Sequence, residues 1–224
     1  RIRDNINTFK EIFNSVFSEF QCFYSIKSNY LESVLKIISS EDTGAELISL
    51  PELNTTLKAG FNPNKIILGG PYLPNKLIKS SLENSIKEII IYDLDDLKRV
   101  NKIADDLNQT QDICLRINSM KFESKLGVKI NKTVVKKILN LFSKCSNLNL
   151  TTLLSHYSTQ MNSLNQFLEN FNVLIKAKEL LKQENLDVRN INIGGGFPEA
   201  TVMPKKQLKK IAQGIKRYIK KKSI

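Results

Sequence analysis

Short apolar runs alternate with helical patterns along almost the whole chain, and this alternation restricts the fold more than any other feature. Seven strand-like runs cover residues 22–26, 45–49, 65–69, 88–92, 113–118, 152–156 and 190–193. Amphipathic helical patterns cover residues 5–19, 31–38, 51–59, 74–82, 95–106, 133–143, 164–184 and 207–222. Strands that are apolar throughout, not only at alternate residues, are typical of a parallel sheet buried on both faces. The pattern predicts an α/β fold, a TIM-type (β/α)8 barrel with seven of its eight strands visible.

Length and composition are typical of one globular domain. The 224 residues, 41% of them hydrophobic, suffice for a single barrel domain over residues 1–224 with a substantial core. The longest apolar runs are far too short to span a bilayer, and no signal segment opens the chain. The three cysteines are scattered along the sequence. These features predict a cytoplasmic protein without a membrane partner.

The net charge of +12 suggests a nucleic-acid partner until the charges are located. Nine cations and no acid lie in the last segment: Lys205, Lys206, Lys209, Lys210, Lys216, Arg217, Lys220, Lys221 and Lys222. Such a segment could contact RNA or an acidic partner. No aromatic ladder accompanies the cations, so the sequence favours a solvated helix face over nucleic-acid binding.

A lysine closes the first strand-like run. The segment Phe23-Tyr24-Ser25-Ile26-Lys27 is followed by a turn and a helical pattern, which places Lys27 at the mouth of a barrel, where active sites form. A lysine walled by apolar side chains can lose its proton and attack an aldehyde such as that of pyridoxal phosphate. The alternative is a solvated lysine at a strand end.

Three further strand ends carry unusual residues. The last strand runs into Gly194, Gly195 and Gly196, whose backbone can approach a phosphate closely; the alternative is a flexible turn. His156, at the end of another strand, is the single histidine of the chain. It is either a core residue or part of the same mouth, and its isolation argues against a metal site. Arg116 closes a strand in the same way, and Glu46 lies on the second strand.

Five motifs stand in order along the chain: FYSIKSNY, AELISLPEL, LRIN followed by SKLGV, LLSHYSTQ and INIGGGFP. Together they resemble the barrel domain of the ornithine/diaminopimelate/arginine decarboxylase family, the alanine-racemase-like fold-type III enzymes that use pyridoxal 5'-phosphate. The resemblance covers nearly the whole chain. It implies an amino-acid decarboxylase of the cytoplasm, in lysine or polyamine biosynthesis, that acts on a basic amino acid or diaminopimelate.

The resemblance also implies residue roles. Lys27 would hold the cofactor as the internal aldimine, and His156 would stack on its ring. Gly194, Gly195, Gly196 and Thr159 would hold its phosphate. Arg116 and Glu46 would lie beside the cofactor, with Glu52 at a further acidic position.

The departures from the family concern the parts that complete the site. Ser158 stands where the family usually has glycine, and the Glu-Pro-Gly-Arg motif, whose carboxylate pairs with the pyridinium nitrogen, has no match. The C-terminal β-domain, which finishes the site across a homodimer, has no match either. We therefore expect a partial chain, incomplete at its C-terminus, that is inactive without the rest. A non-catalytic pyridoxal-phosphate-binding or regulatory relative is the alternative function, and a basic interaction protein is the third.

Overall fold

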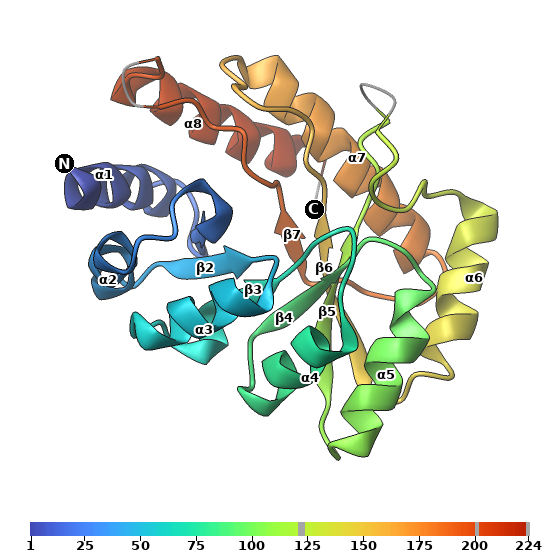
Figure 1. Ribbon diagram of the computed structural model, residues 1–224. Coiled ribbons are helices and arrows are strands. Elements are labelled where there is room, and N and C mark those ends of the chain that lie inside the picture. The colour runs from blue at the N-terminus through green and yellow to red at the C-terminus, as the bar shows by residue number, and fades with distance from the viewer. Residues whose placement is uncertain (121–123, 200–201, 223–224) are drawn as a thin grey trace.

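The strands form one curled parallel sheet. The computed structural model describes residues 1–120, 124–199 and 202–222. Within them lie seven strands: β1 (Phe23–Ser25), β2 (Gly44–Leu47), β3 (Ile66–Leu68), β4 (Glu88–Ile91), β5 (Gln111–Arg116), β6 (Leu148–Leu154) and β7 (Asn190–Asn192). Each strand pairs in parallel with the next in chain order (Figure 1). In the described part of the chain β1 and β7 are not paired with each other, so the predicted barrel is present as an open half-barrel.

Helices connect the strands and cover the outside of the sheet. They are α1 (Ile2–Asn14), α2 (Glu32–Ser40), α3 (Leu50–Lys58), α4 (Asn75–Glu83), α5 (Asp96–Asp106), α6 (Lys132–Phe142), α7 (Leu164–Lys182) and α8 (Lys205–Lys221). The expected helix over residues 5–19 begins and ends earlier than predicted. The amides of Val16 and Phe17 both donate to the carbonyl oxygen of Phe13 in a tight turn, and this turn ends the helix.

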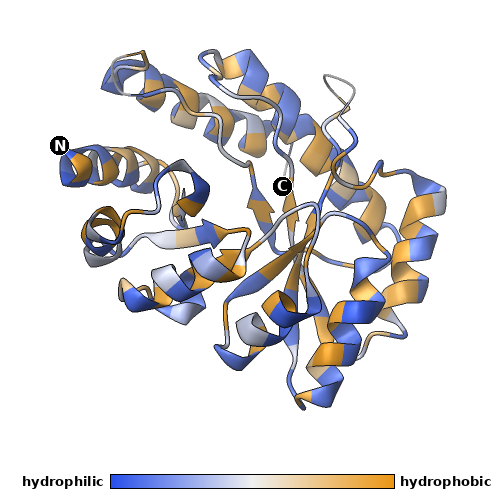
Figure 2. Cartoon of the chain, viewed as in Figure 1, coloured by the Kyte–Doolittle hydropathy of each residue, from blue (hydrophilic) through white to orange (hydrophobic). Residues whose placement is uncertain are grey.

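Burial on both faces explains why the strands lack polar alternation. Toward the helices, Ile66, Ile89 and Leu153 are fully buried in the main core. Toward the interior of the half-barrel, Ile90 and Cys114 pack in a second, smaller cluster. Figure 2 shows the hydrophobic residues concentrated in the central strands and on the helix sides that face them. Parallel sheets require this arrangement, because helices cover the face opposite the interior.

A third apolar cluster lies on the side where the sheet is open. It joins α1, α7 and α8, and α1 and α8 lie side by side (Figure 1). Its aromatic rings are closely packed. The centre of the Phe9 ring lies 4.7 Å from that of Phe13 and 5.0 Å from that of Phe197, and the Phe13 and Phe20 ring centres are 4.8 Å apart. This cluster anchors Phe197, which directly follows the glycine run. Beside it, a groove of about 930 Å³ separates β1 from β7. We call this groove, together with β1 and β7 on its two sides, the seam.

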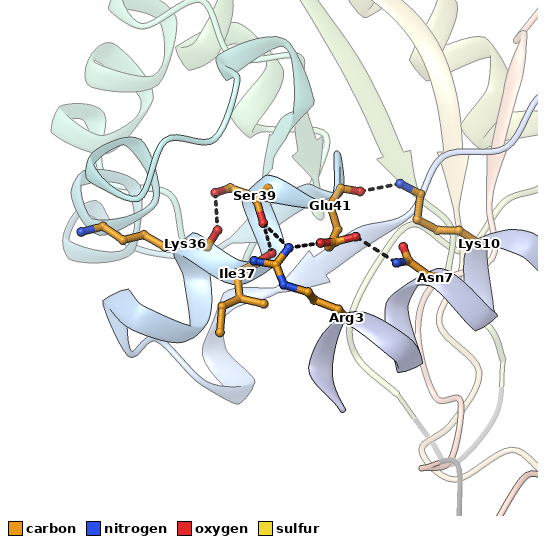
Figure 3. A network of polar contacts seen from close by, with 8 residues as sticks. Arg3, Asn7, Lys10, Lys36, Ile37, Ser39 and Glu41 are labelled. Atoms are coloured by element: carbon orange, nitrogen blue, oxygen red, sulfur yellow. Dashed lines mark hydrogen bonds and ion pairs between the residues drawn. The ribbon is translucent and has the colours of Figure 1, made fainter.

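Polar contacts fasten α1 to the end of α2. Arg3 and Asn7 both reach the carboxylate of Glu41, and the Asn7 distance is 3.0 Å. The Lys10 ammonium donates to the carbonyl oxygen of Glu41 over 2.6 Å (Figure 3). Hydrogen bonding to Asn7 and Arg3 lowers the pKa of the Glu41 carboxyl below its usual value. The network keeps the N-terminal helix beside the seam.

Helix α8 has two distinct faces. Leu208, Ile211 and Ile215 are buried in the cluster with α1 and α7, which confirms that the apolar side of this helix packs inward. The basic side chains from Lys205 to Lys222 are exposed, and no ion pair between described residues includes one of them. The described residues contain no helix long and apolar enough to cross a membrane.

Candidate functional site

The residues selected from the sequence lie at one end of the sheet. Lys27 is in the short 3-10 turn Ile26–Ser28 that follows β1, and Glu46 is on β2. Arg116 is the last residue of β5, His156 lies just beyond β6, and the glycine run follows β7. Because all strands are parallel, these carboxyl ends form one mouth.

Electrostatic contacts show that these groups are close enough to influence one another. Burial is the main reason that the pKa of the Glu46 carboxyl is raised; the charges of Lys27 and Arg116 oppose the rise, and Glu52 adds to it. A half-buried carboxylate between two cations is therefore part of the mouth.

Tyr92 is a member of this group that the sequence motifs did not single out. It directly follows β4, and the guanidinium carbon of Arg116 lies 4.5 Å from the centre of its ring. Burial raises the pKa of its hydroxyl, and Arg116 partly offsets this. The available signal was its place at the end of the fourth strand-like run. The contact orients Arg116 over an aromatic face.

His156 is half-buried and lies beside the glycine run. Burial lowers the pKa of its imidazole, and the nearby charges of Arg116 and Lys27 lower it further. The ring is consequently neutral near pH 7. A Cβ placed on Gly194 would lie 3.1 Å from His156 Nδ1 and 2.9 Å from the Ser155 carbonyl oxygen. The close packing of the two strand ends therefore requires glycine at position 194.

The glycine run has the backbone geometry of an anion cradle. Gly194 and Gly196 have φ values of 69° and 89°, in the left-handed region that favours glycine. The Gly194 amide donates to Asn192 Oδ1 over 2.8 Å. No residue in the described part of the chain accepts a hydrogen bond from the amide of Gly195 or Gly196. Gly195 is exposed, with open space where a Cβ would project.

The loop that carries Thr159 lies against this run. A Cβ on Gly196 would lie 2.2 Å from the Ser158 carbonyl oxygen, and the Met161 amide donates to the Gly196 carbonyl over 2.7 Å. Thr159 is exposed at the surface of the same loop. The structure thus brings Thr159 and the three glycines together from separate parts of the chain.

One expectation about the mouth needs correction, and one residue there has an additional role. The apolar wall expected around Lys27 is wrong for the described residues, because the turn Ile26–Ser28 leaves the Lys27 side chain exposed. Glu52 takes part in capping α3. Its carboxylate accepts from the Ile48 amide over 2.7 Å, while its own amide donates to the Ser49 hydroxyl.

The interior contains a buried carboxyl that the motifs also missed. Glu88, at the start of β4, accepts from the hydroxyl of Thr151 over 2.7 Å and from that of Thr152. Burial raises its pKa, and these hydrogen bonds partly offset the rise. It lies at the opposite end of the strands from the mouth. The residues that the structure describes include no group of three His, Cys, Asp or Glu side chains placed to hold a metal ion.

Comparison with known proteins identifies the family. The family model described as "Pyridoxal-dependent decarboxylase, pyridoxal binding domain" matches residues 1–223. The chain belongs to this family. Among curated proteins, it is 25% identical over 209 residues to diaminopimelate decarboxylase of Staphylococcus aureus, covering 88% of this chain and 48% of that protein. The Haemophilus influenzae diaminopimelate decarboxylase is 28% identical over 189 residues, covering 79% of this chain and 45% of the relative.

Solved structures show the same fold. A diaminopimelate decarboxylase from M. jannaschii superposes with a TM-score of 0.87 at 20% identity, covering 99% of this chain and 55% of that one. The lysine/ornithine decarboxylase from Vibrio vulnificus, complexed with cadaverine, gives 0.78 at 18% identity, covering 98% and 57%. The chain spans about half the length of the curated relatives it matches.

Proposed function

We propose that this chain is the barrel part of a pyridoxal-phosphate-dependent amino-acid decarboxylase, acting on diaminopimelate or a basic amino acid. The observation that carries the proposal is the convergence of Lys27, His156 and the glycine run at one mouth. The curated relatives, named as diaminopimelate decarboxylases, support the substrate class.

The residues present fit the cofactor. The amides of Gly195 and Gly196 are free of acceptors in the described residues, and successive free amides suit a phosphate group. The Thr159 hydroxyl lies in the adjoining loop. Lys27, exposed at the mouth, is accessible to the aldehyde, and the neutral His156 ring can face the pyridine. Arg116 and Glu46 lie alongside and complete the binding residues.

Bound there, the cofactor supplies an electron sink for the carbanion left by loss of carbon dioxide. The residues of this chain hold and orient it. Lys27 would provide the amine that attaches it, and the glycine amides would donate hydrogen bonds to its phosphate. Tyr92 keeps Arg116 in place, and the carboxyl of Glu46 balances the positive charge of Arg116 and Lys27.

The mouth carries an apolar rim, which supports a covered site and a homodimer in the full-length enzyme. Exposed large apolar side chains occur in several loops that follow the strands: Tyr30, Leu31, Ile48, Tyr72, Met120, Leu126 and Val202. Because the strands are parallel, these loops lie at the mouth end of the sheet, where a partner subunit would cover their apolar side chains. We place the full-length enzyme in the cytoplasm, in lysine or polyamine biosynthesis.

Borohydride reduction followed by peptide mapping tests the proposal. Incubation of the protein with pyridoxal 5'-phosphate and reduction should label the peptide that contains Lys27. Lys27→Ala should remove the label, while Lys58→Ala, an exposed lysine on α3, should keep it. A label on another lysine in the wild-type protein would contradict the proposed site.

A non-catalytic pyridoxal-phosphate-binding relative is the second candidate function. The open seam and the exposed Lys27 favour it for these residues by themselves, because neither encloses a reacting group. Labelling of Lys27 without carbon dioxide release from the protein that contains the relatives' remaining half would select this second function.

A further inference from the structure

Asn170 on α7 is a fully buried polar residue in the interior of a helix, 0% exposed, where asparagine is a weak helix former. Its side-chain nitrogen donates to the Ser155 carbonyl oxygen over 3.0 Å and to the Ile193 carbonyl oxygen over 2.8 Å. Because both partners are acceptors, the orientation of the amide group follows from them.

The two carbonyl groups lie where β6 and β7 separate. The Ser155 amide still donates to the Asn192 carbonyl over 3.1 Å, as in the strand ladder. Beyond this point the chains diverge, and no backbone amide in the described residues donates to the carbonyl group of Ser155 or Ile193. Unpaired buried carbonyl groups are costly, so Asn170 supplies both missing donors from α7.

Each of these peptide groups directly precedes a residue of the proposed cofactor site. The Ser155 carbonyl belongs to the peptide that leads into His156, and the Ile193 carbonyl belongs to the peptide that leads into Gly194. We infer that Asn170 is a positioning residue: it fixes both peptides and thereby holds His156 and the phosphate-binding glycines in register. The inference rests on the proposed cofactor site for its functional meaning.

Hydrogen exchange tests the positioning role without any ligand. Asn170→Leu replaces the amide with an apolar group of similar size, and Leu174→Ala, one turn further along α7 and 0% exposed, is the matched control. Asn170→Leu should raise amide exchange about ten-fold at residues 155–161 and 193–196 relative to β4 and β5, the size expected for lost hydrogen bonds. Equal increases in both variants, or none, would overturn the inference.

Selectivity for phosphate tests its consequence. The ratio of pyridoxal 5'-phosphate affinity to pyridoxal affinity should fall about ten-fold in Asn170→Leu, because only the phosphorylated compound carries the group that the glycines hold. The same ratio should stay at the wild-type value in Leu174→Ala. An unchanged ratio in Asn170→Leu overturns the link to the phosphate. If the wild-type protein binds neither compound, the proposed function fails, and hydrogen exchange still decides the role of Asn170. If Asn170→Leu does not fold, Asn170→Asp, whose protonated form offers one donor, should show the same selective exchange at smaller size.

Discussion

Strands β3 and β7 are both three residues long, yet all residues of β3 are buried and none of β7 is. The difference comes from their neighbours. β3 is paired on both sides, with β2 and β4, whereas β7 has one partner, β6, in the described residues. We call the strands from β2 to β6 the wall. The comparison shows that burial of a strand in a parallel sheet depends as much on its lateral partners as on its own residues.

The wall and the seam also contribute different residues to the mouth. The wall contributes Glu46, Tyr92 and Arg116 from well-buried strands. The seam contributes Lys27 and the glycine run from strand ends next to a groove of about 930 Å³. Glu46 and Glu88, which face the interior, also line this groove. The interior is therefore accessible from the side as well as from the mouth.

The largest effect is expected on activity. Unpaired strand edges invite association, and a side opening admits water to the interior. The 224 residues by themselves should bind pyridoxal 5'-phosphate weakly and release no carbon dioxide from lysine, ornithine, arginine or diaminopimelate. Carbon dioxide assays on these residues, and on a protein that joins them to the half present only in the relatives, test this. Robust turnover by the shorter protein would show that the seam needs no further closure.

A matched pair of isoleucine substitutions compares how much the wall and the seam contribute to the free energy of unfolding. Ile66 on β3 is 0% exposed, and Ile191 on β7 is half-buried. Ile66→Ala should lower the free energy of unfolding by about 2–5 kcal/mol, the usual cost of removing a buried aliphatic side chain. Ile191→Ala should cost less, since its side chain is already partly in water. Urea denaturation gives both values, and equal losses would contradict the comparison.

The strands of the wall could be predicted from the sequence because the pattern that indicates a buried strand is local. Apolar runs such as Ile89-Ile90-Ile91 indicate buried parallel strands wherever they occur, and all seven expected strands are present in the described residues. The two short strands of the seam were predicted from apolar runs of the same kind, and the lysine and the glycines that follow them predicted the mouth. The residue types at the strand ends therefore located the candidate site.

Other features depend on contacts between distant segments. Asn170 looks like an ordinary helix residue in the sequence, and only the fold brings it to Ser155 and Ile193. The surroundings of Lys27 were misjudged: it lies in a one-turn 3-10 helix, and its side chain is exposed. The capping role of Glu52 was also missed, although its position three residues after Ser49 is that of a helix cap.

A smaller effect is expected at His156, where the wall meets the seam. If its ring stacks on the cofactor, His156→Ala should weaken pyridoxal 5'-phosphate binding several-fold, since ring stacking contributes on the order of 1 kcal/mol. His156→Phe keeps an aromatic face and should retain most of the affinity. Absorbance titration measures both. Unfolding of His156→Ala would instead support a structural role for the histidine in the core.

The smallest effect concerns the dependence of stability on pH. Burial, with Arg116 and Lys27, lowers the pKa of His156 below its ordinary value of 6.5. Between the lowered value and 6.5 the unfolded chain binds more protons than the folded one, so stability falls as pH falls through this window. Glu46 and Glu88, whose pKa values burial raises, act in the opposite direction. Both carboxyls remain in His156→Gln, so the difference between this variant and the wild type isolates the histidine. The urea midpoint of the wild type, relative to that of His156→Gln, should decline as pH is lowered from 7 through this window. If the urea midpoints of the two proteins change with pH by the same amount, the pKa of His156 is not lowered by its surroundings.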